Sequence, residues 1–119
     1  MATVTLTKGN FEEVTSQGTV FIDFWAAWCL PCQRFAPIYD EVAEANPDIF
    51  FAKVDVDAQP ELAAGFDIRS VPTLLVIRDR IRVFARAGAL PGDVLQELAE
   101  AVRTLDMDLI REGLAQQAH

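Results

Sequence analysis

The sequence predicts one α/β domain in which a mixed, five-stranded central sheet is flanked by four helices on both faces. Strand-like apolar runs alternate with amphipathic helix-like runs, and the last two predicted strands are separated only by the turn Asp79-Arg80. Alternation produces parallel strand pairs, whereas a tight turn produces an antiparallel hairpin. The 119-residue chain is long enough to bury one core but not two.

The strands are expected where apolar, β-branched and aromatic residues gather between turn signals: residues 4–6, 19–25, 49–56, 73–78 and 81–87. The second of these runs is apolar except for Asp23, which is typical of a strand buried on both faces. The last run alternates apolar side chains with arginines. That pattern predicts a half-exposed strand at the edge of the sheet.

The first helix is predicted to start at Asn10 as its N-cap, with Glu13 placed to complete a capping box. The second helix begins at the cysteines, because Pro31 suits a first turn and apolar residues then recur at helical spacing. A short third helix begins near Pro60, and a final amphipathic helix ends at Leu105.

Two parts of the chain are distinguished by this pattern. Residues 1–105 account for the predicted sheet and its helices. Residues 106–119 form a C-terminal extension, whose apolar residues could continue the last helix.

Charge and hydropathy argue against several classes of function. A net charge of −8 disfavours nucleic acids and anionic membranes as partners, because both require clustered positive charge. The longest uninterrupted apolar run, residues 24–30, is far too short to cross a bilayer. The N-terminus shows no basic region followed by an apolar stretch, so we expect the protein to be cytoplasmic.

Cys29 and Cys32 are the only cysteines, and they lie at the predicted start of a helix. Their spacing lets the two sulfurs form a disulfide without moving the backbone. The unpaired N–H groups and the positive dipole end at a helix N-terminus stabilise a thiolate, so Cys29 is the predicted nucleophile. Cys32 would resolve the mixed disulfide, and lying one turn further in it should be less exposed than Cys29.

The resolving step needs a group that accepts the proton of Cys32, and Asp23 is the candidate. Burial within an apolar strand would raise the pKa of Asp23 toward the range useful for proton transfer. Lys53, predicted on a neighbouring strand, would oppose that rise. The sequence leaves the net direction of the pKa change open.

Two other uses of the cysteine pair are possible. A static structural disulfide is disfavoured, because so short a loop removes little chain entropy from the unfolded state. A zinc or iron–sulfur site normally needs four protein ligands, and the chain offers two cysteines and His119. Such a site would require a cluster shared between two chains.

The segment from Phe24 to Cys32, FWAAWCLPC, resembles the active-site segment of the thioredoxin family. The resemblance extends over residues 4–105 and includes Asp23, Pro37, Lys53, Val71-Pro72-Thr73 and Gly88. It implies the thioredoxin fold. The chain departs from the family by having Leu30 in place of the usual glycine and Gln33 in place of a basic residue. Loss of that positive charge should raise the pKa of Cys29 slightly.

The resemblance also implies roles for residues outside the cysteine pair. Pro72 would follow a cis peptide bond beside the dithiol, and the Val71 backbone would pair with an extended substrate segment. The implied docking surface comprises Trp28, Val71, Pro72, Gly88 and Ala89. The residues expected to tune the redox reaction are Leu30, Pro31 and Lys53.

By the same resemblance, the protein would be a protein-disulfide reductase that binds no cofactor or metal. A flavin-containing thioredoxin reductase would recycle it with electrons from NADPH, and proteins with disulfides would be its substrates. We expect a monomer. Two alternatives stay open: a binding module for which turnover is incidental, and a disulfide oxidant or isomerase whose potential is shifted by Leu30.

Overall fold

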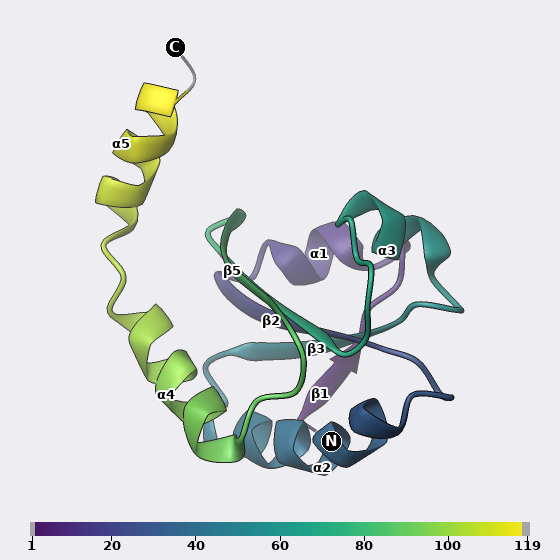
Figure 1. Cartoon of the computed structure of the whole chain (residues 1–119). Helices are drawn as coiled ribbons and strands as arrows, with labels where there is room; N and C mark the ends of the chain where they lie inside the picture. Colours follow the sequence, from purple (N-terminus) through teal and green to yellow (C-terminus); the bar gives the residue numbers. More distant parts are fainter. Residues whose placement is uncertain (1, 118–119) are drawn as a thin grey trace.

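The computed structural model describes residues 2–117 and contains a five-stranded sheet between layers of helices (Figure 1). The strands are β1 (Thr3–Thr5), β2 (Thr19–Trp25), β3 (Phe50–Asp55), β4 (Thr73–Arg78) and β5 (Ile81–Ala87). Their order across the sheet is β1-β3-β2-β4-β5. β3 is parallel to β1 and β2, whereas β4 is antiparallel to β2 and β5. The predicted mixed α/β fold is confirmed, with β5 at an edge.

Helices cover both faces of this sheet. They are α1 (Phe11–Thr15), α2 (Leu30–Ala45), α3 (Pro60–Gly65), α4 (Gly92–Arg103) and α5 (Met107–Gln117). α2 and α4 lie against one face and α1 and α3 against the other, while α5 extends away from the sheet (Figure 1). None of the helices within residues 2–117 is long and apolar enough to span a membrane.

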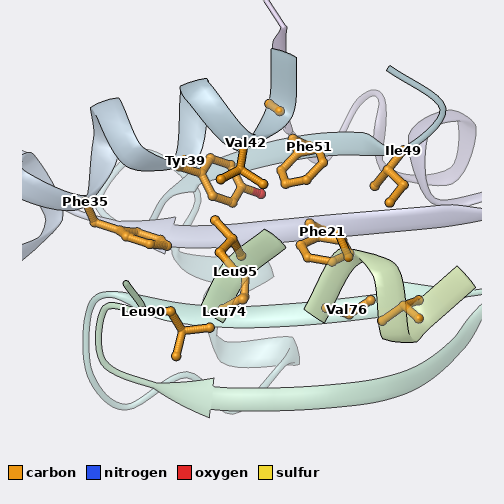
Figure 2. Packing of buried hydrophobic residues seen from close by; sticks show 13 residues of the cluster. Phe21, Phe35, Tyr39, Val42, Ile49, Phe51, Leu74, Val76, Leu90 and Leu95 are labelled. Atoms are coloured by element: carbon orange, nitrogen blue, oxygen red, sulfur yellow. The ribbon is translucent and has the colours of Figure 1, made fainter. Parts of the chain in front are cut away.

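The larger hydrophobic core lies between the sheet and the helices α2 and α4. Phe21 of β2 and Phe51 of β3 pack with their ring centroids 4.8 Å apart, and Tyr39 of α2 packs edge-on against Phe51 (Figure 2). Successive side chains of a strand point to opposite faces, so Asp23 shares the face of Phe21 and points toward α2. Ile22 and Phe24 point the other way, into the cluster covered by α1 and α3.

The start of α1 differs from its prediction. Asn10 occupies the N-cap position, but its side chain makes no capping hydrogen bond, and the expected capping box with Glu13 is absent. Instead, Asn10 Oδ1 accepts a hydrogen bond from the Thr7 N–H at 2.7 Å, and its Nδ2 donates to the Thr5 carbonyl at 2.9 Å. The side chain therefore secures the β1–α1 connection.

The sequence allowed the C-terminal extension to continue α4, but in the structure it forms a separate helix, α5. Arg78 of β4 donates hydrogen bonds to the carbonyl oxygens of Val102 and Leu105, at 2.7 and 3.0 Å, where α4 ends. Asp106 Oδ1 then accepts a hydrogen bond from the backbone N–H of Leu109 at 3.1 Å, as a helix N-cap does. Arg78 at the end of α4 and the Asp106 cap at the start of α5 thus separate the two helices.

Candidate active site

The two cysteines form a disulfide at the N-terminus of α2. Cys29 is the N-cap residue, and its Cα lies 5.2 Å from that of Cys32. Cys29 Sγ accepts a hydrogen bond from the Cys32 backbone N–H at 3.2 Å. A helix N-terminal donor is therefore directed at the Cys29 sulfur, where it would stabilise the negative charge of a thiolate.

Both cysteines are almost completely covered in this disulfide state. Cys29 is 4% exposed and Cys32 is 3% exposed, so the predicted difference in exposure is absent. They share an apolar cluster with Ala26, against which Trp25 and Val71 pack. The roles of the two sulfurs are thus distinguished by the helix cap at Cys29 and not by exposure.

The loop before β4 lies directly beside Cys29. The Val71–Pro72 peptide bond is cis, and the Val71 carbonyl oxygen is 3.6 Å from Cys29 Sγ. The Gly88 N–H donates to the Pro72 carbonyl at 2.8 Å, which holds the end of β5 against this loop. Gly88 has a φ of +99°, a backbone conformation that favours glycine. The structure therefore brings Val71, Pro72, Gly88 and the exposed Ala89 to one side of the disulfide.

Trp28 is the most exposed large apolar side chain of this region, at 71%. Its Nε1 donates a hydrogen bond to Asp57 Oδ2 at 3.0 Å. Trp28 and Val71 border a hollow of about 160 Å³ that Val56 and Ile68 also line. The sequence reasoning assigned no role to Asp57, because its position after the third strand did not reveal which side chain it meets.

Asp23 is a buried carboxyl group without a hydrogen-bond partner among the described residues. It is 1% exposed, and neither carboxylate oxygen accepts a hydrogen bond from a described residue. Burial raises the pKa of Asp23 to about 7, with Lys53 lowering it and Asp40 raising it further. The direction that the sequence left open is therefore upward, which suits a proton acceptor near neutral pH.

Two charged groups from different elements act on Asp23. Lys53 lies opposite Asp23 in the β2–β3 register, and its Nζ is 5.3 Å from the centre of the Trp25 ring. Asp40 belongs to α2, directly follows the buried Tyr39, and has one buried oxygen without a partner among the described residues. The sequence reasoning missed Asp40, although its place beside the apolar face of a helix was a usable signal.

The residues between the cysteines lie at the surface. Leu30 is 52% exposed, and Pro31 is also exposed. Gln33 Nε2 donates to the Ala27 carbonyl at 2.7 Å and so ties the helix start to the preceding loop. Leu30 and Pro31 therefore border the surface that a partner of Cys29 would meet.

The cysteines have no neighbouring side chains that would complete a metal site within the described chain. No group of three or more histidine, cysteine, aspartate or glutamate residues among residues 2–117 could hold a metal ion. His119, considered above as a ligand, lies outside the described residues. The geometry supports disulfide exchange.

Comparisons with known proteins agree with this chemistry. The thioredoxin family model matches residues 2–101. The chain is 52% identical over 117 residues to the putative thioredoxin 2 of Streptomyces coelicolor, covering 98% of this chain and 87% of that relative. It is 41% identical over 99 residues to thioredoxin of Bacillus subtilis, covering 82% of this chain and 95% of that relative.

The fold is also shared with solved structures. A point-mutant thioredoxin from Halobacterium salinarum superposes with a TM-score of 0.80 at 35% identity, covering 86% of this chain and 91% of that one. Thioredoxin from Malassezia sympodialis superposes with a TM-score of 0.72 at 30% identity, covering 81% of this chain and 87% of that one.

Proposed function

Because this chain belongs to the thioredoxin family and is a thiol–disulfide oxidoreductase, we propose that it works in the direction of reducing protein disulfides through Cys29 and Cys32. The observation that carries this proposal is the position of Cys29 Sγ, which accepts the Cys32 N–H at the start of α2. In the reduced protein, this donor favours the thiolate form of Cys29, which is the attacking species.

The first step is attack by the Cys29 thiolate on a disulfide of the partner protein. A Cys29–partner disulfide forms, the partner's own disulfide breaks, and one partner sulfur leaves as a thiolate. The Val71 carbonyl, next to Cys29 Sγ, would accept a backbone N–H of an extended partner segment. Trp28, Gly88 and Ala89 would bound the same segment.

The second step releases the partner. Cys32 gives its proton to the Asp23 carboxylate and attacks the Cys29 sulfur, so that the Cys29–Cys32 disulfide forms and the partner leaves fully reduced. A pKa of about 7 lets Asp23 accept a proton and lose it again near neutral pH. Two electrons pass from the dithiol to the partner.

Two further electrons must then reduce the Cys29–Cys32 disulfide again. We propose that a flavin-containing thioredoxin reductase supplies them from NADPH, and that the reaction takes place in the cytoplasm with a monomeric protein. The relatives named thioredoxin support the assignment of this reductase class. Leu30 and Gln33 lie at the surface that such a reductase would contact, and they are the positions where recognition would differ.

The reduction potential of the Cys29–Cys32 pair tests the proposed direction. The protein is equilibrated in graded glutathione buffers, and the fraction of dithiol is read by thiol trapping. We expect a potential more reducing than the cytosolic glutathione pool. A clearly more oxidising value would refute the reductant assignment and identify an oxidant or isomerase.

The variant Cys32→Ser tests the assignment of the two sulfurs. It should accumulate as a covalent mixed disulfide with substrate proteins, because the resolving thiol is missing. The variant Cys29→Ser is the matched control and should trap nothing by this route. A Cys32→Ser protein that supports its partner's function without forming a mixed disulfide would instead indicate a binding module.

A further inference from the structure

An arginine-lined groove runs beside the edge strand β5. It has a volume of about 230 Å³ and lies between that strand and the segment that precedes the Val71–Pro72 loop. Its charged and small lining residues include Asp67, Arg69, Arg82, Ala85, Arg86 and Ala87. The groove therefore holds three arginines in a chain whose net charge is −8.

The positive charge in this groove is mostly uncompensated. Arg69 pairs with Asp67 at 3.2 Å, but both side chains are more than three-quarters exposed, so this ion pair is weak and easily exchanged. Neither Arg82 nor Arg86 forms an ion pair with any residue in the described range 2–117. Arginine guanidinium groups bind carboxylates with two parallel hydrogen bonds.

The groove is continuous with the active site. Ser70 lines the groove, and the carbonyl of the next residue, Val71, is 3.6 Å from Cys29 Sγ. At the same end, Ala87 lines the groove, and the N–H of the next residue, Gly88, donates a hydrogen bond to the Pro72 carbonyl. A partner chain that passes Cys29 along this loop therefore has the groove directly in its path.

The outer edge of β5 is open, because β5 is the last strand of the sheet. Ala85 and Ala87 leave room for a backbone to approach this edge, and Arg86 lies between them in sequence, with Arg82 three residues before Ala85. An extended segment is the ligand that suits an open strand edge. A nucleic acid has no peptide N–H and C=O groups with which to continue the sheet, so this edge favours a polypeptide over a nucleic acid.

We propose that this groove binds an extended acidic segment of the substrate protein, with aspartate or glutamate residues near the disulfide to be reduced. The proposal rests on the proposed function and adds a substrate preference to it. Opposite charges increase the rate of encounter more than they increase the final affinity. The effect should therefore be seen in the second-order rate constant of reduction.

The test compares synthetic peptides that carry one disulfide flanked by four glutamates, four glutamines or four lysines. The reduced protein is mixed with each peptide in single-turnover experiments at low ionic strength. The glutamate peptide should react ~10-fold faster than the glutamine peptide, the lower end of electrostatic steering, and the lysine peptide more slowly than both. In ~0.5 M salt the preference should largely disappear.

Protein variants then locate the effect. Arg82→Gln/Arg86→Gln should bring the glutamate-peptide rate down to the glutamine-peptide rate. The control Arg80→Gln/Arg111→Gln removes the same charge at residues that do not line the groove, and it should keep most of the preference. Urea unfolding verifies that both proteins are folded. A preference that survives in the Arg82/Arg86 variant would overturn the proposal.

The outcomes separate this inference from the proposed function. Failure to reduce any of the peptides would refute the reductase activity itself. Equal rates for all three peptides would leave the reductase standing and refute the acidic-segment groove. Inhibition by a short single-stranded DNA, without inhibition by a polyglutamate peptide, would assign the groove to nucleic acid and also refute the proposal.

Discussion

Replacing Asp23 with asparagine should stabilise the protein at alkaline pH. A carboxyl whose pKa rises from 3.8 in the unfolded chain to about 7 in the folded protein destabilises the fold by about 4 kcal/mol once it is ionised. The physical cause is burial, because neither oxygen of Asp23 has a hydrogen-bond partner among the described residues. Asparagine cannot ionise, so the variant avoids this penalty.

The sign of the pH dependence follows from proton binding. Between about pH 4 and pH 7, the folded protein keeps the Asp23 proton while the unfolded chain loses it, so the free energy of unfolding falls as pH rises. From pH 5 to pH 8, Asp23 should account for a fall of about 3 kcal/mol in the wild-type protein. The Asp23→Asn protein should lack this fall.

Urea unfolding of the oxidised proteins at pH 5, 6, 7 and 8 measures both quantities, and the closed disulfide keeps cysteine ionisation out of the comparison. Glu44→Gln is the matched control, because it removes a carboxylate from the exposed side of α2. The control should keep the wild-type pH dependence. Parallel stability curves for wild type and Asp23→Asn would refute the reasoning.

Three further substitutions have defined outcomes. Asp40→Asn should lower the pKa of Asp23, because the Asp40 charge raises it, and Lys53→Gln should raise that pKa for the opposite reason. A carboxyl carbon NMR titration of Asp23 checks both, and shifts in the same direction would contradict the assignment. Leu95→Ala should lower the free energy of unfolding by about 2–5 kcal/mol, since the side chain is fully buried. Leu109→Ala, at a position 63% exposed, is its control in urea unfolding and should change little.

Much of the fold could be predicted because its signals are local or periodic. The run from Thr19 to Trp25 is buried on both faces as expected, and the arginine-rich strand lies at the sheet edge. α2 begins at the cysteine pair, as predicted from Pro31 in its first turn and from the apolar residues that recur at helical spacing. These features depend on spacing along the chain.

The wrong predictions concern groups whose partners come from elsewhere in the chain. Asn10 has the right residue type for a capping box, but the backbone groups of Thr5 and Thr7 bind its side chain instead. α4 ends where Arg78 of β4 donates hydrogen bonds to the carbonyl oxygens at its C-terminus. No pattern within either segment indicates these competing partners.

The amino-acid sequence predicts the chemistry of this protein, with a dithiol at a helix N-terminus and an aspartate in the preceding buried strand. The resemblance to the thioredoxin family adds the proline loop to the same site. How that chemistry is tuned depends on the tertiary structure, and so does the position of the arginine groove. The pKa of Asp23 depends on burial and on charges from β3 and α2 together. The arginine groove exists because β5 lies against the segment before β4. Electrostatic effects act through space, so distances between separate elements determine them.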